Sequence, residues 1–182
     1  MRTIVYTLLA EGFEEVEALA PVDLLRRAGI ETVTVSIEKE RVVTGARGVS
    51  VVADLLFEEL EEEKMKMLIL PGGYPGYENL GKDERVAALL KRAAAQGLDI
   101  AAICGAPSVL GGLGLLEGRV ATCYPGMEPL LGCAHSMDAV VEDGPFITSR
   151  GAGTALEFSL ALVARLAGRE KAEELRRGIV MP

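Results

Sequence analysis

The chain has 182 residues, of which 49% are hydrophobic and 25% are charged. This length and balance are typical of one folded domain over residues 1–182, and they argue against a disordered chain, a collagen-like chain and a two-domain enzyme. The formal charge is −8, from 19 Lys and Arg against 27 Asp and Glu. Because a duplex phosphate backbone would be repelled by this net charge, nucleic acid is not expected as a partner.

Short apolar segments alternate with longer helical patterns along the chain. Strands are predicted at 4–9, 32–37, 65–70, 98–103, 119–122, 139–141 and 146–149, with an irregular hairpin at 44–52. Helices are predicted at 16–27, 84–96, 107–113, 154–166 and 170–177, the fourth opened by a capping box from Thr154 to Glu157. Continuous apolar strands belong to sheets that are covered on both faces. The pattern therefore predicts an α/β fold with a mainly parallel sheet, whose ligands bind at the carboxyl ends of the strands.

The cysteines and the apolar segments predict a cytoplasmic protein without a membrane span. Cys104, Cys123 and Cys133 are an odd and sparse set, which is typical of reduced thiols rather than of a disulfide framework. The apolar run 3–10 meets a cluster of glutamates without a cleavage site, so we interpret it as a buried strand and not as a signal peptide. The longest uncharged run, 100–116, is interrupted by a proline and four glycines.

The most informative residue is Cys104, which lies between a predicted strand and a predicted helix. A thiol at such a turn leaves the sheet and faces the partly positive end of the following helix, which favours the thiolate. The small residues Gly105 and Ala106 allow a tight turn, like the elbow on which hydrolases hold a serine. The alternative is that Cys104 is a small buried core residue, since free cysteines pack well in apolar interiors.

Four segments in chain order carry a family resemblance. They are Glu-Gly-Phe-Glu-Glu-Val-Glu at 11–17, Pro-Gly-Gly at 71–73, Ala-Ala-Ile-Cys-Gly-Ala-Pro at 101–107 and Thr-Ser-Arg-Gly-Ala-Gly-Thr at 148–154. Together they resemble the ThiJ/PfpI superfamily, most closely its Parkinsonism-associated deglycase branch. The resemblance implies a flavodoxin-like three-layer sandwich, usually a homodimer. It also implies an oxidation-sensitive cysteine that matches Cys104 and a carboxyl partner that matches Glu17.

Glu17 is the candidate general acid and base. A carboxyl group close to a thiolate cannot easily ionise as well, so its pKa rises and it keeps a proton to donate. Glu14 and Glu15 lie near the same predicted helix start, and all three could be solvated first-turn acids favoured by the helix dipole. The choice of Glu17 rests on the resemblance.

Backbone and arginine groups complete the predicted site. The N–H groups of Gly73 and Gly105 are candidates to hold negative charge that develops on an oxygen, although Pro-Gly-Gly is also a common turn. Arg47 and Arg150 match arginines that line an anion-binding hollow in the similar proteins, which would suit an acidic or phosphorylated ligand. Taken alone, Arg150 could equally be a surface or helix-pairing residue.

The chain also departs from the family. Its peptidase and amidotransferase relatives place His directly after the cysteine, where this chain has Gly105, so peptidase activity is not expected. Many members of the deglycase branch have a His at the position that matches Tyr124, and a phenol titrates too high to act as a base at neutral pH. His135, the single histidine, is interpreted as a surface residue. Cys123 is interpreted as a packing residue, or as a thiol that resolves an oxidised Cys104.

These observations lead to a hypothesis about function. The resemblance implies a cofactor-free enzyme of the glyoxalase III or deglycase type, a hydrolase or lyase that acts on a reactive aldehyde or dicarbonyl, or its early adduct, and protects against stress. Neither metal nor nucleotide is expected, because one histidine with scattered thiols makes no zinc set and no Gly-x-Gly-x-x-Gly or P-loop pattern occurs. The alternative is a non-enzymatic redox sensor or chaperone-like stress protein with an oxidisable Cys104. A thiazole-biosynthesis role is suggested only by the historical family name.

Overall fold

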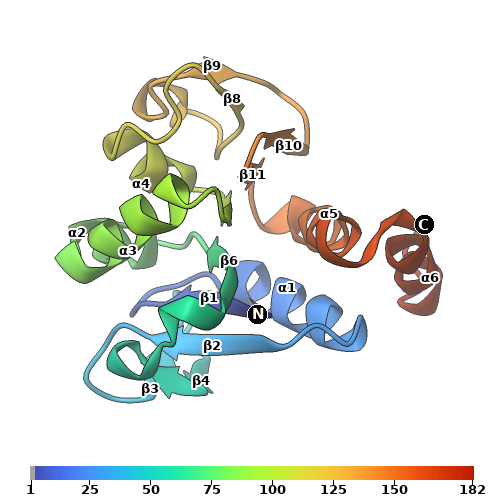
Figure 1. Cartoon of the computed structure of the whole chain (residues 1–182), viewed down its shortest axis with the longest axis horizontal. Coiled ribbons are helices and arrows are strands. Elements are labelled where there is room, and N and C mark those ends of the chain that lie inside the picture. Colours follow the sequence, from blue (N-terminus) through green and yellow to red (C-terminus); the bar gives the residue numbers. More distant parts are fainter. Residues whose placement is uncertain (1–2) are drawn as a thin grey trace.

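A seven-stranded sheet runs through the middle of the computed structural model, which describes residues 3–182 (Figure 1). Its strands are β1 (Ile4–Leu9), β2 (Thr32–Ser36), β5 (Leu55–Leu56), β6 (Met65–Leu70), β7 (Asp99–Ile103), β10 (Val140–Asp143) and β11 (Phe146–Ser149). Two small sheets pair β3 (Val42–Thr44) with β4 (Ser50–Val52) and β8 (Val120–Ala121) with β9 (Ala134–His135). The helices are α1 (Glu15–Arg27), α2 (Gly76–Lys82), α3 (Glu84–Ala95), α4 (Pro107–Gly112), α5 (Ala155–Ala167) and α6 (Arg169–Gly178).

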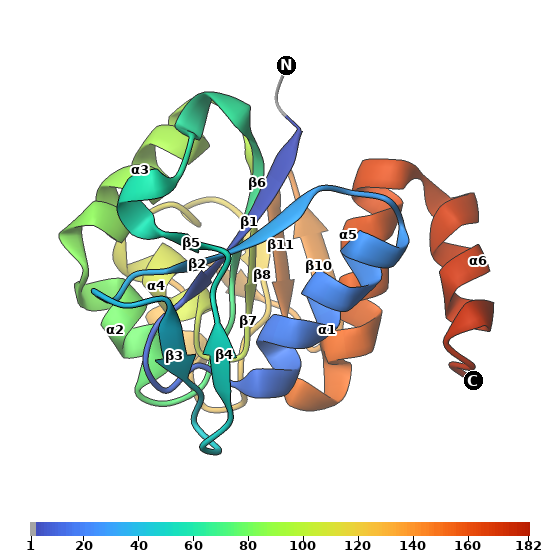
Figure 2. The ribbon, with the colours of Figure 1, turned by 90° about the horizontal axis from the view of Figure 1, so that it is seen from below.

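The strand order is β10-β11-β7-β6-β1-β2-β5. All neighbours in the sheet are parallel except β10, which runs antiparallel to β11 at one edge. Helices α2, α3 and α4 cover one face, and α1, α5 and α6 lie on the other (Figure 2). This arrangement confirms the predicted α/β sandwich with a mainly parallel sheet.

The core consists of two layers, one on each face of the sheet. Alternate residues of β1 point to opposite layers, so that Tyr6 and Leu8 pack under α3 and α4 while Val5 packs under α1 and α5. The same alternation places Leu68 and Met67 of β6 in different layers. Burial on both faces explains why these strands are apolar at nearly every position.

Most predicted elements lie where the sequence places them, and the differences are local. The predicted capping box of α5 does not form, because Thr154 makes no side-chain cap. Its Oγ1 donates instead to the carbonyl of Gly151 at 2.9 Å and lies 2.7 Å from the hydroxyl of Ser149. A short 3₁₀ turn, Ala152–Thr154, therefore precedes the helix. Within residues 3–182, no helix combines the length and the apolar composition that a membrane span needs.

Asp83 is expected to be one of the stronger surface contributors to stability. Its carboxylate accepts the N–H of Arg85 at 2.8 Å at the start of α3, and it pairs with the Arg85 guanidinium at 2.6 Å. Burial alone would raise the pKa of Asp83, but the hydrogen bonds from Arg85 outweigh burial and lower it. Its contribution is therefore present above the unfolded-state pKa and is lost as the pH falls through the folded-state pKa.

We expect Asp83→Ala to lower the free energy of unfolding by about 1–2 kcal/mol at neutral pH, measured by urea denaturation. Asp83→Asn is the matched control, because an amide oxygen still caps the helix while the charge is gone. The alanine variant should lose clearly more stability than the asparagine variant. Equal losses would show that the ion pair, and not the cap, carries the effect.

Candidate active site

A strained turn joins the end of β7 to the start of α4. Cys104 occupies this turn with φ of 65°, in the left-handed region that residues with a side chain rarely adopt. Its N–H donates to the carbonyl of Ser149 at 3.0 Å, and its carbonyl accepts the N–H of Tyr124 at 2.8 Å. These two bonds hold the cysteine in its strained conformation, and strain of this kind concentrates at functional sites. The predicted elbow is therefore present at Cys104.

Glu17 lies in the first turn of α1 and reaches the sulfur. Glu17 is 1% exposed, and its Oε2 and the Cβ of Cys104 lie side by side, each 2.6 Å from the position that a Cβ on Gly72 would take. The backbone N–H of Gly72 donates to its Oε2 at 2.9 Å. Burial raises the pKa of Glu17 to about 7, although the hydrogen bond with Cys104 partly opposes this rise. Glu17 can therefore hold or release a proton near neutral pH.

The two neighbouring glutamates have different tasks. Glu14 precedes α1 and its carboxylate accepts the N–H of Glu17 at 2.8 Å, so it caps the helix. Glu15 is buried and accepts the N–H groups of Arg47 at 2.8 Å and Val49 at 3.3 Å. It thereby fixes the turn between β3 and β4. Because Glu14 and Glu15 are engaged in these hydrogen bonds, Glu17 is the acid that lies beside the sulfur. The three glutamates are therefore not equivalent solvated acids.

The charge state of Cys104 differs from the thiolate expected at a helix start. Burial, followed by the negative charge of Glu17 and their hydrogen bond, raises the pKa of Cys104 to about 12. The N–H groups of Gly105 and Gly73 face the sulfur and lower the pKa only in part. Loss of water around the sulfur outweighs any effect of the following helix, which is only 6 residues long. Two negative charges so close together are unfavourable, so the pair carries a single charge once it has lost one proton. Cys104 is then a thiolate only while Glu17 holds the remaining proton.

Cys104 opens into a cavity of ≈ 530 Å³. Its lining is mostly nonpolar and comes from the carboxyl ends of the strands: Glu14, Glu17, Arg47, Gly73, Tyr74, Tyr77, Cys104, Gly105, Tyr124, Pro125, Gly126, Met127 and Ala152. The structure thus brings together six predicted site residues, namely Cys104, Glu17, Gly73, Gly105, Arg47 and Tyr124. Cys104 is not sealed in the core.

Two predicted site residues do not line this cavity. Arg150 follows β11, and the Nε of its side chain is buried without a hydrogen-bond partner among the described residues. Burial raises the pKa of Cys123 to about 11, and the positive charge of Arg150 opposes this rise only in part. Cys123 is 1% exposed and its sulfur donates to the carbonyl of Tyr124 at 3.4 Å. Cys123 therefore packs in the core, in agreement with its interpretation as a packing residue.

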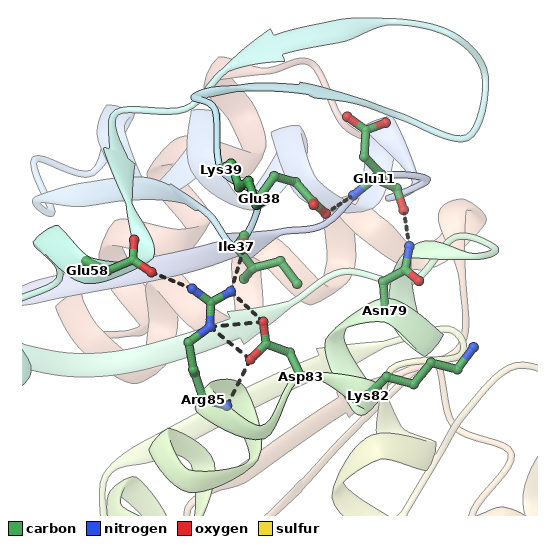
Figure 3. Close-up of a pocket in the computed structure, with 9 residues that line it drawn as sticks. All are labelled: Glu11, Ile37, Glu38, Lys39, Glu58, Asn79, Lys82, Asp83 and Arg85. Carbon is green, nitrogen blue, oxygen red and sulfur yellow. Dashed lines mark hydrogen bonds and ion pairs between the residues drawn. The ribbon is translucent and has the colours of Figure 1, made fainter.

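A second hollow, of ≈ 860 Å³, lies at the ends of β1 and β2 and the start of α3 (Figure 3). Three of its charged groups pair with one another: Arg85 pairs with Asp83 and Glu58, and it donates to the carbonyl of Ile37 at 2.6 Å. The described lining contains neither a thiol nor a histidine. This hollow is a structural ion network. Across residues 3–182, no group of three His, Cys, Asp or Glu side chains is placed to hold a metal ion.

Tyr74 and Tyr77 are the aromatic residues of the cavity that the sequence did not predict. Tyr74 follows Pro-Gly-Gly directly at the carboxyl end of β6, and Tyr77 lies three positions further on, in the first turn of α2. Aromatic residues just after a central parallel strand lie where ligands bind in open α/β sheets, so their position was the available signal.

A cysteine elbow paired with a buried glutamate at the carboxyl edge of a parallel sheet defines a class of α/β proteins, and comparisons with known proteins identify the family. The model of the DJ-1/PfpI family matches residues 3–165, so the chain belongs to this family. It is 38% identical over 177 residues to protein dj-1beta of Drosophila melanogaster, with 96% of this chain and 95% of that protein covered. It is 35% identical over 156 residues to a deglycase of Pyrococcus abyssi, covering 84% of this chain and 92% of the relative.

Other relatives are longer, and solved structures share the fold. The chain is 42% identical over 176 residues to protein DJ-1 homolog B of Arabidopsis thaliana, covering 95% of this chain but only 40% of that protein. The structure of oxidized Toxoplasma gondii DJ-1 matches with a TM-score of 0.94 at 36% identity over 98% of both chains. Drosophila melanogaster DJ-1beta matches with a TM-score of 0.94 at 37% identity over 100% of both chains.

Proposed function

We propose that the protein is a cofactor-free, cysteine-dependent enzyme of the glyoxalase or deglycase type, which converts reactive dicarbonyls or their early adducts to hydroxy acids. The observation that carries this proposal is the adjacent pair of Cys104 and Glu17, which lines an open cavity and in which burial raises the pKa of the acid to about 7. The similarity to the Pyrococcus abyssi deglycase supports the same reaction class.

The chemistry uses the pair in two ways. The sulfur of Cys104 adds to the aldehyde carbon as the shared proton passes through Glu17 to the new oxygen, giving a hemithioacetal. Glu17 then takes the proton from the former aldehyde carbon and returns one to the neighbouring carbon, so the aldehyde is oxidised to a thioester while the ketone is reduced to an alcohol. Water releases the hydroxy acid and restores the thiol. No external oxidant or reductant is required.

Hydroxy-acid formation from methylglyoxal tests this proposal. Cys104→Ala should reduce the rate to that of buffer, and Glu17→Gln should lower kcat/KM by about 10²- to 10⁴-fold, since the proton carrier is gone. Cys133→Ala, which removes a thiol outside the cavity, is the matched control and should keep full activity. In the parent protein kcat/KM should rise as the pH passes through about 7, where the pair loses its first proton. A Cys104→Ala variant as fast as the parent protein would overturn the proposal.

A second candidate function is redox sensing through Cys104. The solved Toxoplasma gondii relative is described as oxidized, and here the N–H groups of Gly73 and Gly105 face the sulfur and could hold the oxygens of a sulfinate. Intact mass after mild peroxide treatment separates the two functions. A sensor should gain two oxygens at Cys104 while dicarbonyl turnover stays at the background rate. Efficient turnover by the reduced protein would favour the enzyme.

A further inference from the structure

Aromatic side chains are concentrated at the Cys104 cavity. The chain has 4 tyrosines and no tryptophan, and Tyr74, Tyr77 and Tyr124 all line this one cavity. They come from two segments that are distant in the sequence: Tyr74 and Tyr77 from the end of β6 and the start of α2, and Tyr124 from the loop after β8. A single tyrosine-rich stretch of sequence therefore does not explain why the three rings line the same cavity.

Backbone hydrogen bonds connect two of these tyrosines to residues that line the cavity. The N–H of Tyr77 donates to the carbonyl of Gly73 at 2.9 Å, and that of Tyr124 donates to the carbonyl of Cys104 at 2.8 Å. The Tyr77 ring lies so close to Gly105 that a Cβ on that glycine would be 2.7 Å from the ring. The backbone of both residues and the ring of Tyr77 are therefore held close to the reactive cysteine.

The third ring extends this wall outward. The centroids of Tyr74 and Tyr77 are 6.5 Å apart with the planes tilted by 55°, a geometry that aromatic pairs prefer. Tyr74 is 70% exposed and Tyr124 is 52% exposed, so neither ring serves mainly to fill the core. Exposed aromatic rings gathered at a reactive group are typical of a ligand-contacting surface.

The size of the cavity points to a substrate larger than a three-carbon dicarbonyl. A volume of ≈ 530 Å³ lies within the range of sites that hold drug-sized ligands. We propose that the cavity selects carbonyl compounds that carry an aromatic ring, with Tyr77 and Tyr124 as the specificity-determining residues and Tyr74 as the outer wall. This inference deepens the proposed function, on which it rests for the reaction that follows binding.

Alkylation of Cys104 measures this selectivity without turnover. 2-Bromoacetophenone and bromoacetone carry the same reactive carbon, and the thiolate displaces bromide from each to form a carbon–sulfur bond. Peptide mass mapping gives the rate of alkylation at Cys104 for each reagent. The ratio of the 2-bromoacetophenone rate to the bromoacetone rate is then divided by the same ratio for N-acetylcysteine. Because a change in thiol pKa affects both reagents alike, the normalised ratio reports the preference for the ring.

We expect the parent protein to prefer the aryl reagent by about 10- to 100-fold after normalisation, since each ring pair contributes a few-fold to tenfold. Tyr77→Leu and Tyr124→Leu should each lower the preference several-fold, whereas Tyr77→Phe, which keeps the ring, should retain it. A ratio within twofold of the free thiol, leucine variants that match the parent, or a Cys104 that neither reagent reaches would each overturn the inference. A high ratio in a protein that does not turn over dicarbonyls would overturn the proposed reaction instead and leave the aromatic selectivity standing.

Discussion

Replacing Glu17 by Gln is expected to raise the free energy of unfolding by about 3 kcal/mol at about pH 8. Burial raises the pKa of Glu17 to about 7 from a model value of 4.5, so the folded protein holds a proton there that the unfolded chain has already lost. The parent protein must therefore lose stability as the pH rises from about 4.5 to about 7. A glutamine carries no charge, still accepts the N–H of Gly72 through its amide oxygen, and avoids this loss.

Urea denaturation of both proteins at several pH values checks this result. The two stabilities should agree within about 0.5 kcal/mol at about pH 4, where Glu17 is protonated in both states, and should diverge above it. Glu63→Gln, at an exposed position, is the matched control and should show no such divergence. If Glu17→Gln were no more stable than the parent at about pH 8, the acid would not be the buried, proton-holding group described here. Greater stability with lower activity would be a trade-off between stability and function at this residue.

Replacing Gly73 by Ala is expected to lower the free energy of unfolding by about 4 kcal/mol or more, or to prevent folding. Gly73 has φ of 90°, and a Cβ there would lie 2.3 Å from the backbone nitrogen of Glu14 and 2.6 Å from the carbonyl oxygen of Gly12. These are backbone atoms, which cannot rotate away as a side chain can. Relief of the clash would move the loop after β6 away from the start of α1, and with it the N–H of Gly73 from the sulfur of Cys104.

Gly29→Ala is the matched control for the backbone conformation alone. Gly29 has φ of 77°, but nothing lies within 4 Å of the position that a Cβ would take. Its loss should be about 1–2 kcal/mol, the usual cost of the left-handed conformation. The difference between the two midpoints in urea therefore measures the close approach of the two loops. Equal losses would mean that the loops are less tightly packed than the structure has them.

The sequence is sufficient to predict the sheet and the place of the reactive turn. Strands such as β6 and β7 are buried on both faces, so their apolar runs are continuous and their ends are marked by Pro-Gly-Gly and by Cys-Gly-Ala. The position of Cys104 between strand and helix follows from these local signals. The partnership with Glu17 needed the family resemblance, because spacing alone does not distinguish three glutamates in one helical turn.

Other features depend on three-dimensional packing, which no local pattern contains. The raised pKa of Cys104 comes from loss of water and from a carboxylate that lies 87 positions earlier in the chain. Whether Arg150 faces the cavity depends on how the loop after β11 turns, and in the structure Arg150 does not line the cavity. Thr154 has the sequence of a capping residue, but the hydroxyl of Ser149 and the carbonyl of Gly151 bind its side chain instead. For Cys104 a partner distant in the sequence outweighs the local preference, whereas for Thr154 two partners within five residues replace the capping bond.

The edges of the central sheet bear on how the protein behaves in concentrated solution. Open sheet edges can recruit strands from neighbouring molecules and start intermolecular aggregation. Here one edge, β5, has only 2 residues, and the other, β10, has 4 residues and ends in the acidic pair Glu142 and Asp143. Few unpaired backbone groups are thus offered to another copy, and like charges oppose its approach. Both edges therefore disfavour the edge-to-edge pairing from which polymers grow.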